Sequence, residues 1–64
     1  MDRPSRYEEH RFLGDKRAQV VYDMDEITDE ALIERVNELA STSFGLTFGP
    51  DTLAEARNRG YRPV

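Results

Sequence analysis

The sequence contains no cysteine and no tryptophan, and only one histidine, among its 64 residues. Without cysteine, neither a disulfide nor a thiolate zinc site can form. A single histidine excludes a site built from several histidines of one chain, so no metal or other cofactor is expected. No apolar run approaches the roughly 18 residues of a membrane-spanning helix. The N-terminal stretch also lacks the apolar centre of a secretory signal. We therefore expect no membrane association and a cytoplasmic location.

The length allows one small domain. Chains of this size bury only about 60% of their unfolded surface, and they often depend on disulfides, a metal or a partner. With the first two excluded, stability must come from packing, self-association or a partner chain. We expect a flexible tail over residues 1–6 and a single domain over residues 7–64.

Charge is distributed unevenly along this small acidic protein. Thirteen acidic and nine basic residues give a net charge of −4. Residues 23–38 hold seven acids against Arg35 alone, a local balance of −6. Because an acidic chain repels nucleic acid unless its cations gather on one face, nucleic acid is not the expected partner.

The first third of the chain predicts a β-hairpin over residues 7–24. We expect a first strand over residues 7–13 and a tight turn at residues 14–16, where Gly14 can adopt positive φ. The second strand alternates from Ala18, with Val20, Tyr22 and Met24 on the same face. The opposite face would then carry Gln19, Val21 and Asp23.

The next segment predicts an amphipathic helix. Thr28 is expected as its N-cap, with Ile27 and Leu32 at the spacing of a hydrophobic staple. The helix should end near Ala40 or Ser41. One apolar stripe is formed by Leu32, Ile33, Val36, Leu39 and Ala40.

The last third predicts a short strand, a short helix and a final strand. Phe44, Leu46 and Phe48 alternate as in a strand, and residues 49–50 end it. Thr52 and Glu55 have the spacing of a capping box, with Asp51 as the alternative cap. Gly60 suits the left-handed position after a helix, which would fold Tyr61 back over Ala56. A final strand is expected over residues 61–64.

Together these elements predict an α+β fold in the order ββαβα. The connection over residues 20–44 can form a right-handed βαβ unit. The expected core comprises Phe12, Val20, Tyr22, Ile27, Leu32, Ile33, Val36, Leu39, Phe44, Leu46, Phe48 and Leu53.

Residues 20–27 resemble the first motif of haloacid-dehalogenase-type phosphatases, in which an apolar strand ends in two aspartates separated by one residue. The resemblance covers eight residues. It implies that Asp23 and Asp25 are the two aspartates of the motif, one attacking phosphorus and the other acting as acid or base, with magnesium nearby. Ile27 stands where that family prefers threonine or valine, and the chain is too short for the remaining motifs. The favoured interpretation is a solvated turn between strand and helix.

The sequence contains two further sets of possible metal ligands, and neither is favoured as a metal site. Asp23, Asp25 and Glu34 have the outer spacing of a calcium loop, but Ile27 and Thr28 replace its central oxygen ligand and glycine. In a strand, Glu8 and His10 would converge, and two ligands make a weak site. No metal site is expected, and His10 is interpreted as solvent-exposed.

Two charged surfaces remain as candidate binding sites. The first is the densest cationic patch, which can bind phosphate or an acidic partner and consists of Arg57, Arg59, Tyr61 and Arg62. The second is an acidic helix face, which can dock on a basic surface and consists of Glu30, Glu34 and Glu38. Both patches also have a purely structural interpretation, as stabilisers of a helix end and as a solvated face.

We expect a non-catalytic protein–protein interaction module, an accessory subunit or small regulator of a larger protein, that uses these seven residues. Its segregated charge suits electrostatically steered association. The alternative is a small nucleic-acid or nucleotide-binding domain that uses the arginine and tyrosine cluster. A homodimer through an exposed sheet edge is also possible. No enzymatic activity is expected, and phosphotransfer by Asp23 and Asp25 ranks last.

Overall fold

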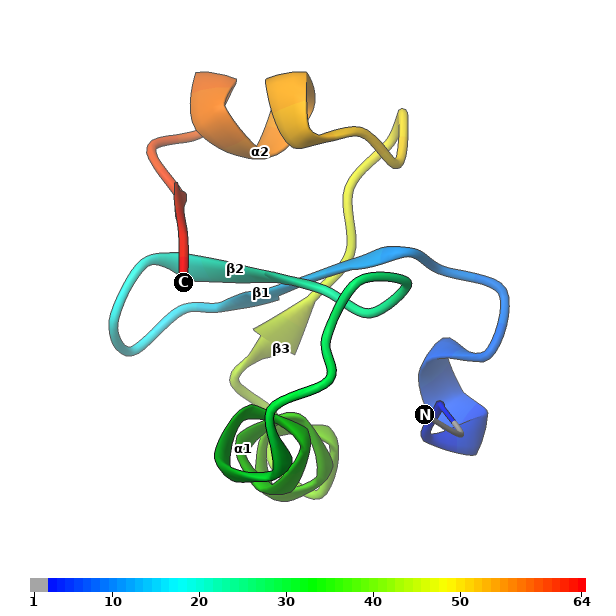
Figure 1. Cartoon of the computed structure of the whole chain (residues 1–64). Coiled ribbons are helices and arrows are strands. Elements are labelled where there is room, and N and C mark those ends of the chain that lie inside the picture. Colours follow the sequence, from blue (N-terminus) through cyan, green and yellow to red (C-terminus); the bar gives the residue numbers. More distant parts are fainter. Residues whose placement is uncertain (1–2) are drawn as a thin grey trace.

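The computed structural model describes residues 3–64, which form an α+β fold (Figure 1). A four-stranded mixed sheet lies at its centre, with the strand order β3-β1-β2-β4. The fold class and the ββαβα order predicted from the sequence are confirmed, with a short 3-10 helix added before the first strand. In chain order the elements are η1 (Ser5–Tyr7), β1 (Phe12–Asp15), β2 (Val20–Asp23), α1 (Glu30–Ala40), β3 (Gly45–Leu46), α2 (Leu53–Asn58) and β4 (Arg62–Pro63).

The two α-helices cover opposite faces of the sheet (Figure 1). On the α1 side, Leu13 and Tyr22 from the sheet pack with Val36 and Leu39 of the helix. On the α2 side, the alternate sheet residues Phe12 and Val21 pack with Phe48 and Ala56. The expected shared face of Val20, Tyr22 and Met24 is confirmed, since all three belong to the α1-side cluster. Val21 was expected to point away from the core, and it is 2% exposed because α2 covers that second face.

The hairpin is confirmed, but its bounds differ from those predicted. β1 pairs antiparallel with β2 from Phe12 opposite Asp23 to Asp15 opposite Val20. The first strand begins at Phe12 and not at Tyr7, which instead ends η1, and the turn occupies residues 16–19, where Gln19 has φ 53°. Gly14 lies within β1, where the ring of Phe48 crosses it: a Cβ there would meet Phe48 Cζ at 2.9 Å. The glycine is needed for this close approach and not for a turn.

Helix α1 begins one residue later than expected and ends where expected. Asp29 is the N-cap, and its carboxylate accepts a hydrogen bond from the Ala31 amide at 2.8 Å. The expected staple is therefore out of position, although Ile27 and Leu32 still pack in the same cluster. At the other end, the Ser41 hydroxyl donates to the Glu38 carbonyl at 2.6 Å. This bond satisfies one of the free carbonyls that every helix end leaves.

The N-terminal segment contacts the same end of α1. The Arg6 guanidinium donates to the carbonyl oxygens of Ala40 and Thr42 at 3.0 and 3.2 Å. Tyr7, at the end of η1, is 6% exposed in the α1-side cluster. Residues 1–2 of the expected flexible tail lie outside the described residues.

Helix α1 connects two strands that are not neighbours. β1 pairs antiparallel with both β2 and β3, so β2 and β3 run in the same direction with β1 between them. The expected βαβ connection therefore passes over one intervening strand. β4 pairs parallel with β2 at the other edge, which confirms the final strand predicted near the C-terminus.

Helix α2 follows the sequence pattern closely. Thr52 is the N-cap, and its hydroxyl oxygen accepts from the Glu55 amide at 3.1 Å. Gly60 has φ 88°, and the amides of Gly60 and Tyr61 donate to the carbonyls of Arg57 and Ala56. This pair of bonds is the Schellman arrangement that places the residue after the glycine back over the helix. Tyr61 accordingly packs against the α2-side cluster, as predicted.

Most of the expected core is buried or half-buried, with one error. Phe44, which immediately precedes β3, is 45% exposed, with the Arg17 guanidinium 5.3 Å from its ring centroid. The two faces of the sheet also bury residues that the prediction omitted, which are Tyr7, Leu13, Val21, Met24, Ala40 and Ala56.

Candidate interaction site

The four residues of the predicted cationic patch differ in how freely they can contact a partner. Arg57 and Arg62 are exposed at the end of α2 and in β4. The Arg59 guanidinium instead donates to Glu55 at 2.9 Å, one helical turn earlier. Tyr61 is half-buried, and its ring meets that of Phe48 edge-on with centroids 5.5 Å apart. The arginine pair Arg57 and Arg62 is therefore the part of this patch that is exposed and forms no ion pair within residues 3–64.

The predicted acidic face of α1 is divided in a similar way. Glu30 and Glu34 are exposed, and neither forms an ion pair with a residue in the range 3–64. Glu38, in contrast, receives two hydrogen bonds from Arg17, each 2.9 Å long. The acidic pair Glu30 and Glu34 belongs to α1 and Arg57 to α2, so these residues lie on opposite faces of the sheet, whereas Arg62 lies in the edge strand β4 (Figure 1).

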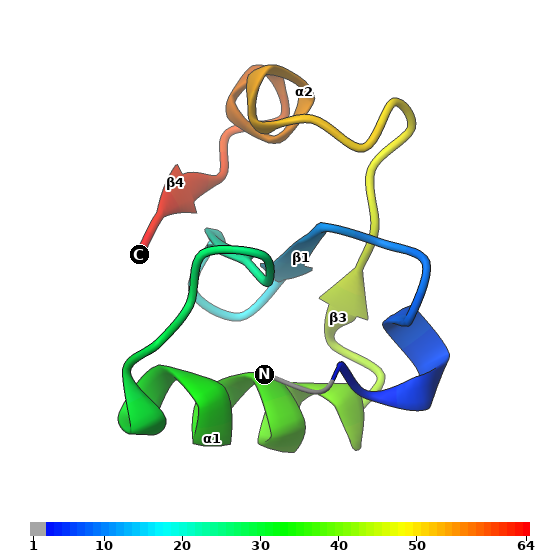
Figure 2. The ribbon, with the colours of Figure 1, turned by 45° about the vertical axis from the view of Figure 1, so that its right-hand side comes forward.

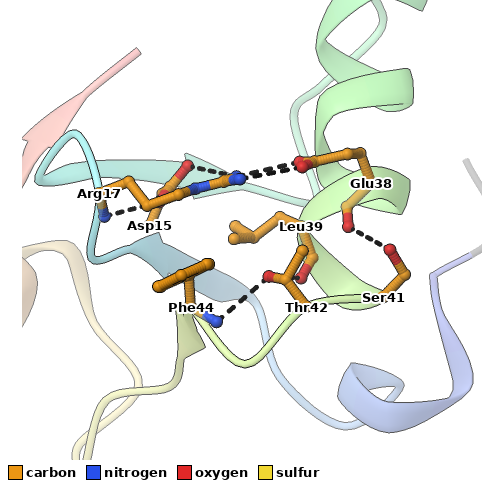
Figure 3. A network of polar contacts seen from close by, with 7 residues as sticks. All are labelled: Asp15, Arg17, Glu38, Leu39, Ser41, Thr42 and Phe44. Atoms are coloured by element: carbon orange, nitrogen blue, oxygen red, sulfur yellow. Dashed lines mark hydrogen bonds and ion pairs between the residues drawn. The ribbon is translucent and has the colours of Figure 1, made fainter.

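Arg17 forms a clamp between the hairpin and α1 (Figure 3). Its guanidinium donates to both oxygens of Asp15 at 3.0 Å and to both oxygens of Glu38 at 2.9 Å. These hydrogen bonds from Arg17 lower the pKa of Asp15 and the pKa of Glu38 below their ordinary values. The same hydrogen bonds raise the pKa of Arg17. Glu38 is thus held within the chain, and its role here is structural.

The two aspartates of the phosphatase-like motif are also held by arginine. Arg11 donates to both oxygens of Asp23 at 2.9 Å, and this hydrogen bonding raises the pKa of Arg11. The Asp25 carboxylate forms ion pairs with Arg3 and Arg11. Within residues 3–64, no group of three or more histidine, aspartate or glutamate side chains is arranged to hold a metal ion. The geometry therefore gives Asp23 and Asp25 a charge-pairing role at the end of β2.

The strand on which Glu8 and His10 were expected to converge does not form. The chain turns after η1, and the His10 amide donates to the Tyr7 carbonyl at 3.0 Å. Glu8 and Glu9 are both exposed, and His10 is half-buried. The alternation of a strand does not apply to these residues, because they follow η1 in a turn and β1 begins only at Phe12.

An apolar groove that the sequence did not predict lies between the start of α1, β4 and the start of α2. Figure 2 shows β4 and the loop before α1 on the same side of the molecule. The groove has a volume of about 320 Å³. Its acidic lining residues are Asp23, Glu26 and Asp29. Its apolar lining includes Phe12, Ile27, Leu32, Leu53, Pro63 and Val64.

No local signal identifies this groove, because its lining comes from segments far apart in the sequence. The related sequence feature is the excess of acidic residues over positions 23–38. Only the helical glutamates among them were expected to form a binding surface. The structure gives a second indication of the groove, because the apolar side chain of Val64 is 51% exposed.

Comparisons with protein-family models, with curated proteins and with solved structures find no match to this chain. Function must therefore be inferred from the geometry of the chain itself. Neither α-helix in the described part of the chain has the length and hydrophobicity needed to cross a membrane.

Proposed function

We propose that this chain is a non-catalytic protein-interaction module, an accessory subunit or small regulator of a larger protein. The observation that carries the proposal is the separation of its exposed charges. Glu30 and Glu34 of α1 lie on the opposite face of the sheet from Arg57 of α2, Arg62 lies in the edge strand β4, and none of the four forms an ion pair within residues 3–64. Complementary charge on a partner would steer association and fix its orientation.

Several other charged residues support this interpretation because they are engaged inside the chain. Arg17 binds Asp15 and Glu38, and Arg11 binds Asp23. Carboxylates held in this way are poorly placed for nucleophilic or acid–base chemistry, which favours a binding role over catalysis. A cytoplasmic location belongs to the same proposal.

Nucleic-acid binding is the second candidate, favoured by the exposure of Arg57 and Arg62 near one another in the sequence. Base recognition in single strands usually adds stacking on an exposed aromatic ring. Here the ring of Tyr61 already packs against Phe48. Arg59, which would extend the patch, pairs with Glu55. The geometry therefore favours a protein partner.

The test is affinity capture of the tagged protein from nuclease-treated extract of its native host, with quantitative mass spectrometry. We expect one stoichiometric protein partner. Its recovery should fall at least tenfold for the double reversal Arg57→Glu with Arg62→Glu or for Glu30→Lys with Glu34→Lys. Glu9→Lys is the matched control, because Glu9 is exposed and lies outside both surfaces. Circular dichroism verifies that each variant is folded.

Two results would contradict this proposal. Recovery of the partner that is unchanged in both double variants would remove the charged surfaces from consideration. Salt-sensitive binding of a labelled single-stranded oligonucleotide, lost on reversal of Arg57 and Arg62, would instead support the second candidate, since phosphate contacts weaken as salt rises.

A further inference from the structure

We propose that the apolar groove binds one large apolar side chain of the partner, presented by a segment that carries lysine or arginine on either side of it. This inference rests on the proposed interaction function and specifies the chemistry of the partner. It concerns a surface separate from the arginine pair and from the acidic pair.

The burial of its lining residues makes the groove a preformed site. Phe12 and Ile27 are 5% and 9% exposed, and they form a floor that the folded sheet holds in place. Leu32 and Leu53 are half-buried, and Val64 is 51% exposed. A side chain that enters would remove these partly exposed residues from water, which is the main source of binding energy for an apolar anchor.

The volume limits the size of the occupant. Pockets for small-molecule ligands span roughly 300–1,000 Å³, and a groove of about 320 Å³ lies at the lower end of that range. One large side chain with its neighbouring backbone suits this space better than an extended ligand. The groove is therefore suited to a single anchor residue, with the rest of the partner on the surrounding surface.

Charge determines which residues should flank that anchor. Three acids line the groove, and its lining residues include no lysine, arginine or histidine. Arg11 neutralises Asp23, whereas Glu26 and Asp29 form no ion pair with any residue in the range 3–64. The charge of the groove is thus negative after internal pairing. Basic residues beside the anchor would be attracted, and acidic residues would be repelled.

A second copy of this chain is a less suitable occupant. Phe44 is exposed and lies beside Arg17 and Lys16, so it has a similar chemistry. Contact between Phe44 of one copy and the groove of another would be head-to-tail, and such contacts form open chains unless their rotation closes. Arg17 is also already paired with Asp15 and Glu38. Copies with a net charge of −4 would in addition repel one another.

The experiment is a titration of the isotope-labelled protein, followed by amide chemical shifts in NMR spectra. The probe is a short acetylated peptide with a central leucine, two lysines on each side of it and a glycine–serine background. We expect saturable shifts at the amides of Glu26, Ile27, Leu32 and Val64. Matched peptides with serine for the leucine, or glutamates for the lysines, should each bind at least tenfold more weakly.

Protein variants identify the groove as the binding site. Glu26→Lys and Val64→Asp should each weaken binding of the leucine–lysine peptide at least tenfold. Both side chains are exposed, and the backbone bond from the Val64 amide to the Val21 carbonyl does not depend on the side chain. Glu9→Lys applies the same charge change away from the groove and should bind as the original chain does.

Three results would overturn the inference. These are the absence of saturable shifts at the groove up to roughly millimolar peptide, equal binding of the glutamate peptide, and groove shifts that depend on protein concentration without peptide, which would indicate a second copy. If the peptide does not bind the groove, but the partner is still captured and its capture is lost on reversal of the charged pairs, only this inference is contradicted. If the peptide binds the groove but the charged pairs have no effect on capture, the function proposed from those pairs falls instead.

Discussion

Arg17 is the residue that joins the hairpin to α1. Its planar guanidinium presents several donors in a fixed fork, and here that fork serves two carboxylates at once (Figure 3). Asp15 is 7% exposed and is the one buried charged residue in the described part of the chain. A buried carboxylate needs a charged partner to offset its loss of hydration. Arg17 supplies that partner.

The Arg17 clamp predicts a specific loss of stability in acid. Because Arg17 lowers the pKa values of Asp15 and Glu38, their contribution is complete above the ordinary carboxyl pKa of about 4. It is lost as pH falls through the lowered pKa values, where both groups take up protons in the folded state. Urea unfolding between pH 7 and pH 2 should show this decline. Arg17→Met should be less stable at pH 7 and should show a flatter decline.

Lys16→Met is the matched control for this measurement. Lys16 lies in the same turn and forms no ion pair within residues 3–64. Its loss should leave the decline in acid unchanged. If the free energies of unfolding of Arg17→Met and of the original chain declined in parallel as pH falls, the clamp would not contribute to the loss of stability in acid.

At the scale of elements, α2 depends on contacts outside itself. It has six residues, and so short a helix is not stable alone in water. Asp51, in the loop before it, accepts hydrogen bonds from the amides of Arg11 and Phe12 at 2.6 and 3.0 Å. This carboxylate was expected at most to cap α2, and instead it joins the loop to the start of β1, some 40 positions earlier.

Asp51→Ala should therefore loosen α2 together with the start of β1. The loss of an acceptor for two backbone amides should lower the free energy of unfolding by about 1–3 kcal/mol. Hydrogen exchange should accelerate at the amides of α2. Thr52→Ser is the control, since serine preserves the hydroxyl cap and should change stability little. Exchange in α2 that is unaffected by Asp51→Ala would show that Ala56 and Tyr61 alone hold the helix.

The edge strand β4 also bears on the expected homodimer. The amides of Arg62 and Val64 donate to the carbonyls of Gln19 and Val21 in and beside β2. Backbone amides alternate in direction along a strand, so the nitrogen of Pro63 faces the open edge of the sheet. Proline has no amide hydrogen to donate to another strand there. Proline at this position protects a sheet edge against pairing with another strand. A homodimer through sheet pairing, if it forms, would have to use the β3 edge.

At the scale of the whole molecule, the sheet couples the two helices. β1 supplies Leu13 to the α1 side and Phe12 to the α2 side, and β2 supplies Tyr22 and Val21 in the same manner. Neither helix can leave without exposing strands that the other helix needs. We therefore expect a single cooperative transition for the folded chain.

Leu39→Ala tests this coupling. Leu39 is fully buried in α1, and its truncation should cost about 2–5 kcal/mol. Stability of roughly 0.05–0.15 kcal/mol per residue makes this a large part of the total. The helix signal and the protection of the α2 amides against hydrogen exchange should lose stability together, although α2 lies on the far side of the sheet from Leu39. An unchanged melting temperature, or two separate transitions, would show that the halves are independent.

The sequence alone determined the features that depend on neighbours along the chain. The cap at Thr52, the left-handed Gly60 and the apolar stripe of α1 were all predicted and are all present. Each follows from hydrogen bonds or from a periodicity within about one to three helical turns. The α+β class follows from the order of these elements, and it was predictable for the same reason.

Only the tertiary structure decided the features that depend on distant contacts. Gly14 leaves room for the ring of Phe48 to cross β1, and Val21 is buried because α2 covers the second face of the sheet. The same packing withdrew Tyr61 from the predicted patch and created the apolar groove. Such outcomes depend on which side chains meet across the fold, and no pattern within a single segment contains that information.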